Sequence, residues 1–157
     1  MDDAAILMKL SEAGLELPAS SPPLASYVPV VVTGTTAFVS GQVAMKDGAL
    51  LASGRLGEEL AVDEGAAAAA QAALQALAAL RSALGSFDRL VRIVQVTVYV
   101  AATADFVEHP KVANGASDLL GKILGEEGRH ARAAVGVASL PLGAAVEVAM
   151  TAEVTPA

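Results

Sequence analysis

The carboxyl-terminal stretch, residues 128–154, constrains the fold more than any other part of the chain, because it places two isolated charges inside apolar segments. Residues 131–138 and 145–154 are rich in valine and alanine, and a proline and a glycine stand between them. This pattern predicts two strands joined by a short turn, a β-hairpin. The two charges within the hairpin are Arg132 and Glu147.

A charged side chain in an apolar strand is costly to bury unless it is paired or meets a ligand. The guanidinium of Arg132 is a rigid fork that suits a carboxylate, and the carboxylate of Glu147 can orient a water or accept a proton. The residue types alone leave three interpretations open. These are an Arg132–Glu147 ion pair between strands, an exposed face of an edge strand, and a binding site.

The rest of the chain alternates between helical and strand patterns. In chain order we expect a helix over 2–12, an extended connector with three prolines over 15–26, strands over 27–33 and 36–43, a helix over 64–84 with Asp63 as its N-cap, a strand over 90–101 and a helix over 105–125.

This order predicts a single α+β domain over residues 1–157, in which 1–26 form the helix and connector and 27–154 form the core. Helices are expected to cover one face of a mixed sheet. Because 54% of the residues are hydrophobic and only 17% are charged, we expect another subunit to cover the other face. Gly41, at the end of the second strand, predicts a bulge or a close backbone approach.

Composition also excludes several classes of function. The net charge is −7 and the ten lysines and arginines are scattered, which argues against a nucleic-acid surface. There is no cysteine, and the two histidines have no acidic neighbours at ligand spacing, so we expect no metal site. The acidic N-terminus is unlike a signal peptide, and polar residues interrupt the apolar run over 66–84. We therefore expect a soluble, cytoplasmic protein that is not bound to a membrane.

Short motifs, in order and at matching spacing, resemble those of the Rid family, also called YjgF-like or L-PSP proteins, the reactive intermediate imine/enamine deaminases. The similarity runs over residues 27–154, and residues 1–12 and 113–132 resemble a longer-chain subgroup. The motifs are Tyr27 before the first strand, Ser40-Gly41-Gln42 after the second, Asp105-Phe106 after the valine-rich strand, Arg132, Leu140-Pro141 and Glu147.

The resemblance implies a chorismate-mutase-like subunit with two long helices on one face of the sheet. It also implies a homotrimer whose three sheets form a central barrel, with ligand clefts between adjacent subunits. In the family, the arginine matching Arg132 grips a substrate carboxylate and the glutamate matching Glu147 positions the water. The matches to Tyr27 and the backbone near Gly41 line the cleft, and Asn114 is the nearest candidate for an asparagine that does so from the second long helix.

The activity that the resemblance implies is hydrolysis of a small 2-imino acid, or its enamine tautomer, to a 2-keto acid and ammonia. No metal or organic cofactor is implied. Backbone groups near Gly41 and Ala133 would hold the transient carbinolamine. The family often has cysteine two residues after the arginine, where this chain has Ala134, and we expect the smaller side chain to widen the pocket.

Two other functions remain open on the sequence. A non-catalytic trimer that binds a carboxylate metabolite would use Arg132 but has no need of a second anion at Glu147. An endoribonuclease, an activity attached to some family members, is disfavoured by the −7 charge. We expect His109 and His130 to be surface residues.

Overall fold

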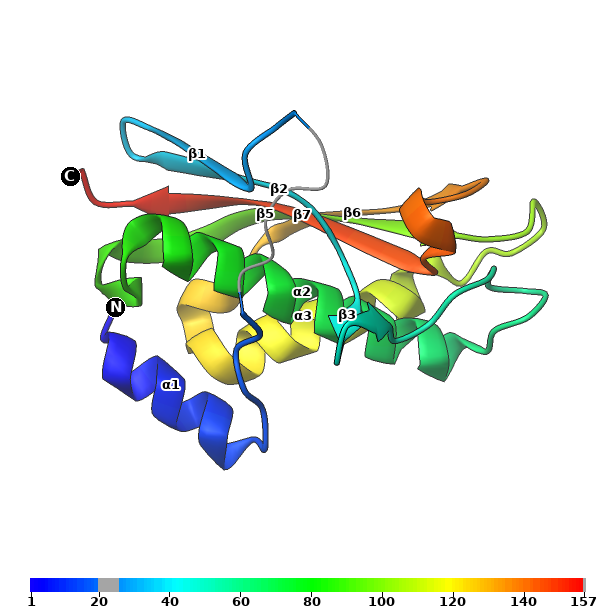
Figure 1. Cartoon of the computed structure of the whole chain (residues 1–157), viewed down its shortest axis with the longest axis horizontal. Coiled ribbons are helices and arrows are strands. Elements are labelled where there is room, and N and C mark those ends of the chain that lie inside the picture. Colours follow the sequence, from blue (N-terminus) through cyan, green and yellow to red (C-terminus); the bar gives the residue numbers. More distant parts are fainter. Residues whose placement is uncertain (20–25, 157) are drawn as a thin grey trace.

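Strand β5 (Leu90–Ala101), which carries the long valine-rich pattern, is an inner strand of the sheet and pairs with a strand on each side. The structure is a computed structural model and describes residues 1–19 and 26–156. A five-stranded mixed sheet crosses the molecule, with helices on one face (Figure 1). Its strands, in spatial order, are β1 (Val30–Thr33), β2 (Thr36–Val43), β7 (Val146–Val154), β5 and β6 (Ala131–Val137).

The predicted α+β architecture is confirmed, but the predicted carboxyl-terminal hairpin is wrong. Strands β6 and β7 do not pair with each other, because β5 lies between them. Val98 of β5 is in register with Ala134 of β6 in the parallel direction and with Val148 of β7 in the antiparallel direction. A parallel β5–β6 pair needs a long crossover, which a helix supplies, and residues 138–145 then cross the end of β5 to start β7.

Helices α2 (Val62–Leu84) and α3 (His109–Leu124) cover one face of the sheet (Figure 1). They pack closely: a Cβ atom added at Gly115 would lie 1.9 Å from the carbonyl oxygen of Ala66. The missing side chain of Gly115 on α3 therefore lets the backbones of the two helices approach closely. The largest fully buried side chains of this layer and the sheet include Leu77, Leu80, Leu120, Ile123, Leu90, Ile93, Val96 and Val98.

Both helices begin at residues other than those predicted. Helix α3 begins at His109 rather than at residue 105, because Pro110 is tolerated only in a first turn, where its missing N–H is not needed. The N-cap of α2 is Ala61 and not Asp63, which lies in the first turn. The Glu64 carboxylate accepts from the Ala61 N–H at 2.9 Å, as in one half of a capping box.

The first strand begins at Val30 rather than at residue 27, and residues 20–25 of the predicted connector lie outside the described residues. Pro29, which precedes the strand, has no N–H to donate to a neighbouring strand. The prediction for Gly41 is confirmed, because the register of β2 on β7 shifts between Val39 and Gln42. Gly41 therefore lies in a β-bulge.

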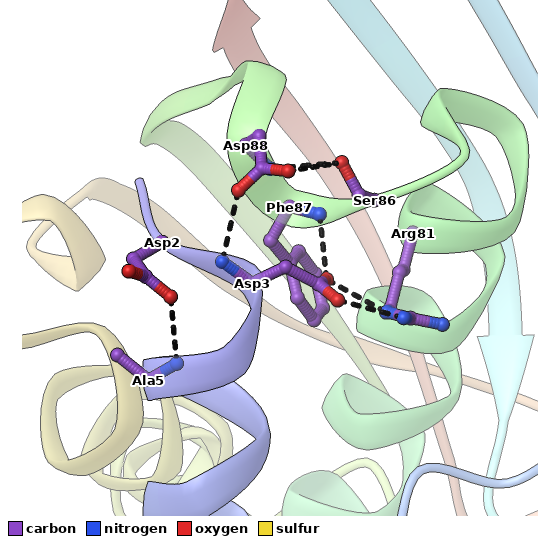
Figure 2. A network of polar contacts seen from close by, with 7 residues as sticks. All are labelled: Asp2, Asp3, Ala5, Arg81, Ser86, Phe87 and Asp88. Carbon is purple, nitrogen blue, oxygen red and sulfur yellow. Dashed lines mark hydrogen bonds and ion pairs between the residues drawn. The ribbon is translucent and has the colours of Figure 1, made fainter.

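Helix α1 (Asp3–Glu12) packs on the outside of the helix layer, against α3 and the short 3₁₀ turn Phe87–Arg89, and it buries Ile6 and Leu10. Figure 2 shows how its first residue is held. The Asp3 carboxylate accepts two bonds of 2.8 Å from the Arg81 guanidinium and a third of 2.8 Å from the Phe87 N–H. The hydrogen bonds from Arg81 lower the pKa of Asp3.

Among residues 1–19 and 26–156, no helix lies on the opposite face of the sheet (Figure 1). Its side chains include Val31 and Phe38, which are 50% and 49% exposed, and Val135, which is 43% exposed. A shallow hollow of about 200 Å³ lies beside Phe38, between β2, β7 and β5. This apolar surface, called here the open face, is left exposed by the part of the chain that the structure describes.

A small hairpin of β3 (Met45–Lys46) and β4 (Ala49–Leu50) completes the secondary structure, together with the 3₁₀ turns Gly125–Gly128 and Pro141–Gly143. Within residues 1–19 and 26–156, no helix has the length and apolar character needed to cross a membrane.

Candidate functional site

Arg132 lies on the edge strand β6 and points toward α3. It is in register with Val96, a buried residue that faces the helices. One terminal nitrogen of its guanidinium, Nη1, donates to Asn114 Oδ1 and to Ser117 Oγ, both at 3.0 Å. The other, Nη2, donates to the Pro110 carbonyl at 3.4 Å. The guanidinium is therefore held by the helix, with Asn114 beside it.

Ser117 and His130 also belong to the group of residues around Arg132. The sequence alone did not indicate Ser117, and it predicted that His130 lies at the surface. The His130 ring is half-buried, with Nδ1 at 2.6 Å from the Gly128 carbonyl oxygen and Nε2 at 3.0 Å from Ser117 Oγ. Ser117 is three residues after Asn114 and therefore shares its helix face, which is the one signal in the sequence. The pairing with His130 depends on how α3 packs against β6.

His109 is also half-buried rather than free at the surface. Its ring contacts the Phe106 ring edge-on, with the ring centres 5.1 Å apart. A Cβ atom added at Gly136 of β6 would lie 2.4 Å from His109 Nε2, so the histidine fills the space above that glycine. We assign it a packing role at the start of α3.

Glu147 lies on the open face of the sheet. Its neighbours Val146 and Val148 are buried against the helices, and side chains alternate along a strand. A Cβ atom added at Gly41 would lie 1.7 Å from Glu147 Oε1, so the carboxylate rests directly on the bulge backbone. The missing side chain at Gly41 makes room for it.

The carboxylate of Glu147 has no hydrogen bond or ion pair within the described ranges 1–19 and 26–156. Burial raises its pKa above the usual 4.5, because desolvation disfavours the charged form. A half-buried carboxylate without a partner is suited to hold a water and exchange a proton with it.

Arg132 and Glu147 are not an ion pair, because β5 separates them. Arg132 is in register with Val96 and Glu147 with Tyr99, so they lie on opposite faces and three residues apart along β5. Strand spacing and rise per residue place their Cα atoms about 14 Å apart. Among the residues that the structure describes, the salt bridges join other partners.

The remaining predicted residues divide between these two places. Ala134 faces the helices, like Arg132, and is half-buried against the core, whereas Ala133 faces the open side. Tyr27 lies in a bend and is 44% exposed. The next residue, Val28, accepts a 2.8 Å hydrogen bond from Ser40 Oγ, which joins this bend to the bulge at Gly41.

The structure therefore contains two separate groups. The arginine half consists of Arg132, Asn114, Ser117, His130 and Ala134. The glutamate half consists of Glu147 and Gly41. We include Tyr27 in it, because the next residue, Val28, is hydrogen-bonded to Ser40 beside Gly41. Neither half contains metal ligands: within residues 1–19 and 26–156, no group of three or more His, Cys, Asp or Glu side chains could hold an ion.

Comparison with known proteins identifies the family. A family model described as "YjgF/chorismate mutase-like, putative endoribonuclease" matches residues 8–154. Protein TCP17 of Trypanosoma cruzi is 46% identical over 144 residues, which cover 91% of this chain and 90% of TCP17.

Solved structures agree with this result. Atu1372 from Agrobacterium tumefaciens, a protein of unknown function, is 39% identical with a TM-score of 0.91, over 97% of this chain and 94% of Atu1372. A Shewanella oneidensis protein described as a "putative endoribonuclease" is 38% identical with a TM-score of 0.92, over 95% and 99% of the two chains. RidA from an Antarctic Psychrobacter is more distant, at 26% identity and a TM-score of 0.59, over 86% and 94%. The chain belongs to the YjgF/chorismate mutase-like family.

Proposed function

We propose that the protein hydrolyses small 2-imino acids, or their enamine tautomers, to 2-keto acids and ammonia. The observation that carries this proposal is the Glu147 carboxylate, which is half-buried, unpaired in the described residues and seated on Gly41. The guanidinium of Arg132 supplies the matching group for a substrate carboxylate. Membership of the family supports the same reaction, because a protein named RidA is among the structural relatives of this chain.

The active site is proposed to form between two copies of the chain. Within one chain the arginine half and the glutamate half lie on opposite faces of the sheet, too far apart to hold one small molecule. The open face exposes Val31, Phe38 and Val135, and a neighbouring subunit would bury them. In a homotrimer, the edge strand β6 of one copy would bring its arginine half to the glutamate half of the next.

In this site, Arg132 would bind the substrate carboxylate and so fix the imine carbon. Glu147 would accept a proton from a water as its oxygen attacks the carbon of the protonated imine, whose C=N π electrons move to the nitrogen, which gives a neutral carbinolamine. The backbone near Gly41 and Ala133 would hold the carbinolamine. The protonated Glu147 would then give its proton to the nitrogen, and the carbon–nitrogen bond would break as the hydroxyl oxygen forms the carbonyl. The hydroxyl proton would pass to the Glu147 carboxylate, and ammonia and the keto acid would leave. The raised pKa of Glu147 makes its carboxylate a stronger base, which favours uptake of the proton from the water.

The direct test is release of ammonia and pyruvate from 2-iminopropanoate, generated in the assay by an amino-acid oxidase. We expect the wild-type protein to accelerate release over the spontaneous rate, and Arg132→Ala and Glu147→Gln to lose at least about 100-fold of that acceleration. The melting temperature of each variant is the control, because Arg132 is exposed and its loss should leave the fold intact. Hydrolysis by Glu147→Gln at the wild-type rate would contradict the proposal.

Mixing two inactive variants tests whether the site is shared between copies. If Arg132→Ala and Glu147→Gln chains are unfolded and refolded together in equal amounts, random assembly restores both side chains in about a quarter of the intersubunit sites. We expect about a quarter of the wild-type activity from the mixture and none from either variant alone. A mixture as inactive as its components would place the whole site within one chain.

The same assays separate the proposal from the two alternatives. A carboxylate-binding trimer would bind pyruvate through Arg132 but would show no turnover, and Glu147→Gln would bind as well as wild type. An endoribonuclease would cleave RNA in an Arg132-dependent manner, whereas the net charge of −7 opposes binding of a phosphate backbone. The unpaired Glu147 carboxylate favours hydrolysis over both.

A further inference from the structure

The guanidinium of Arg132 is bonded on one side only. Of its five N–H donors, the two on Nη1 bind Asn114 and Ser117, and one on Nη2 points to the Pro110 carbonyl. The Nε–H and the second N–H of Nη2 have no acceptor among the described residues. Nε and Nη2 are the two nitrogens of the side-on edge of the fork, which matches the two oxygens of a carboxylate.

His130 determines how Ser117 takes part in this arrangement. The Gly128 carbonyl can only accept, so the ring nitrogen Nδ1, at 2.6 Å, carries the proton. In the neutral ring Nε2 is then an acceptor, and the Ser117 hydroxyl donates to it at 3.0 Å. The lone pairs of Ser117 Oγ remain free to accept from Arg132 Nη1 at 3.0 Å. One continuous chain therefore runs from the Gly128 backbone through His130 and Ser117 to Arg132.

We propose that Ser117 and His130 are positioning residues that hold Arg132 so that its Nε–H and Nη2–H edge faces the substrate carboxylate. The inference rests on the proposed function only in taking a carboxylate as the ligand. His130 sets the direction of the Ser117 hydroxyl, and Ser117 with Asn114 fixes Nη1. Without them Arg132, on an exposed edge strand, would sample other rotamers, and binding would have to order it again.

Two different substitutions of His130 test its hydrogen bonds to Gly128 and to Ser117 one at a time. The amide nitrogen of Asn reaches the position of Nδ1, so His130→Asn keeps the bond to Gly128 and loses the acceptor for Ser117. The amide of Gln reaches the position of Nε2, so His130→Gln keeps that acceptor. Ser117→Ala removes the link itself, and Asp118→Ala, at the exposed neighbouring position of α3, is the control.

The experiment measures kcat and KM on 2-iminopropanoate, and the dissociation constant of pyruvate by calorimetry. For Ser117→Ala and His130→Asn we expect KM and the dissociation constant to rise about tenfold while kcat changes less than about threefold, because Arg132 binds the carboxylate equally in the ground and transition states. His130→Gln should recover to within about threefold of wild type. Asp118→Ala should match wild type, and neither Ser117→Ala nor Asp118→Ala should melt at a lower temperature, because alanine is favourable in a helix.

The outcomes distinguish this inference from the proposed function. Wild-type turnover with an unchanged KM in Ser117→Ala overturns the positioning role and leaves the deaminase standing. Pyruvate binding that weakens in Ser117→Ala, in a protein without turnover, supports the positioning role and overturns the deaminase. A rise in KM that accompanies a lower melting temperature, with no recovery in His130→Gln, assigns a structural role to the cluster and overturns positioning. Absence of both turnover and pyruvate binding in wild type overturns both.

Discussion

Replacing Gly41 with alanine should displace the Glu147 carboxylate without unfolding the protein. The added Cβ atom would lie 1.7 Å from Glu147 Oε1, and real Cβ atoms essentially never come closer than 3.0 Å to another heavy atom. The carboxylate must therefore move by at least about 1.3 Å. The nearest atoms all belong to the flexible end of one side chain, and Gly41 does not have a positive φ, so the backbone can stay in place.

The expected result is a large loss of activity with a small change in stability. A misplacement of about 1 Å in a catalytic group can cost on the order of 100-fold in rate. We therefore expect Gly41→Ala to lower kcat on 2-iminopropanoate about 100-fold, while its free energy of unfolding changes by less than about 1 kcal/mol. Chemical denaturation and the ammonia-release assay measure the two quantities on the same preparation.

Gly121→Ala is the matched control. Gly121 lies within α3, and a Cβ atom added there meets nothing within 4 Å. Alanine is favoured over glycine in a helix by about 1 kcal/mol, so this variant should be slightly more stable and fully active. Full activity in Gly41→Ala would refute the placement of Glu147, and a loss of more than about 3 kcal/mol of stability would show that Gly41 is needed for the fold instead.

Three further predictions concern stability. Asp3→Asn should lower the melting temperature by about 3 °C at neutral pH, because it breaks the bidentate bond to Arg81. This bond holds the folded-state pKa of Asp3 below its usual 3.8. In a series of melts at different pH, the difference from wild type should therefore persist above pH 3.8 and vanish as the pH falls through the folded-state pKa. Glu147→Gln should be inactive but more stable than wild type at neutral pH, because the raised folded-state pKa means that folding disfavours the charged form of Glu147. The gain in stability should disappear below pH 4.5, where Glu147 is protonated in both the folded and the unfolded state. Equal melting temperatures of the variant and wild type at neutral pH would contradict the desolvation of Glu147. Gly115→Ala should cost about 1–3 kcal/mol, because its Cβ would lie 1.9 Å from the backbone oxygen of Ala66, and an unchanged denaturation midpoint would show that α2 and α3 can separate freely.

Local patterns in the sequence predict the elements of this fold well. The alanine and leucine run of α2 and the alternating valines of β5 each determine an element through properties of neighbouring residues. The predicted helix boundaries are less accurate where a single residue overrides the hydrophobic pattern, as Pro110 does at the start of α3. The bulge at Gly41 could also be foreseen, because a glycine inside a strand weakens it and often marks a bulge or a close backbone approach.

Strand pairing is not a local property, and here the prediction failed. Residues 131–138 and 145–154 are close in sequence, which favoured a hairpin, but β5 lies between them in the sheet. The error matters for the site, because a hairpin would allow an ion pair between Arg132 and Glu147. The true order places these side chains on opposite faces of the sheet.

The sequence by itself determined which residues are proposed to carry the chemistry: Arg132 and Glu147 are charges within apolar strands, and such charges need a partner or a ligand. Only the tertiary structure decided what surrounds them. The face on which each lies follows from its register with β5, and the bonds of Arg132 to Ser117 exist because the crossover between the parallel strands β5 and β6 packs α3 against β6. Register and crossover depend on contacts between distant segments, which no window of neighbouring residues records.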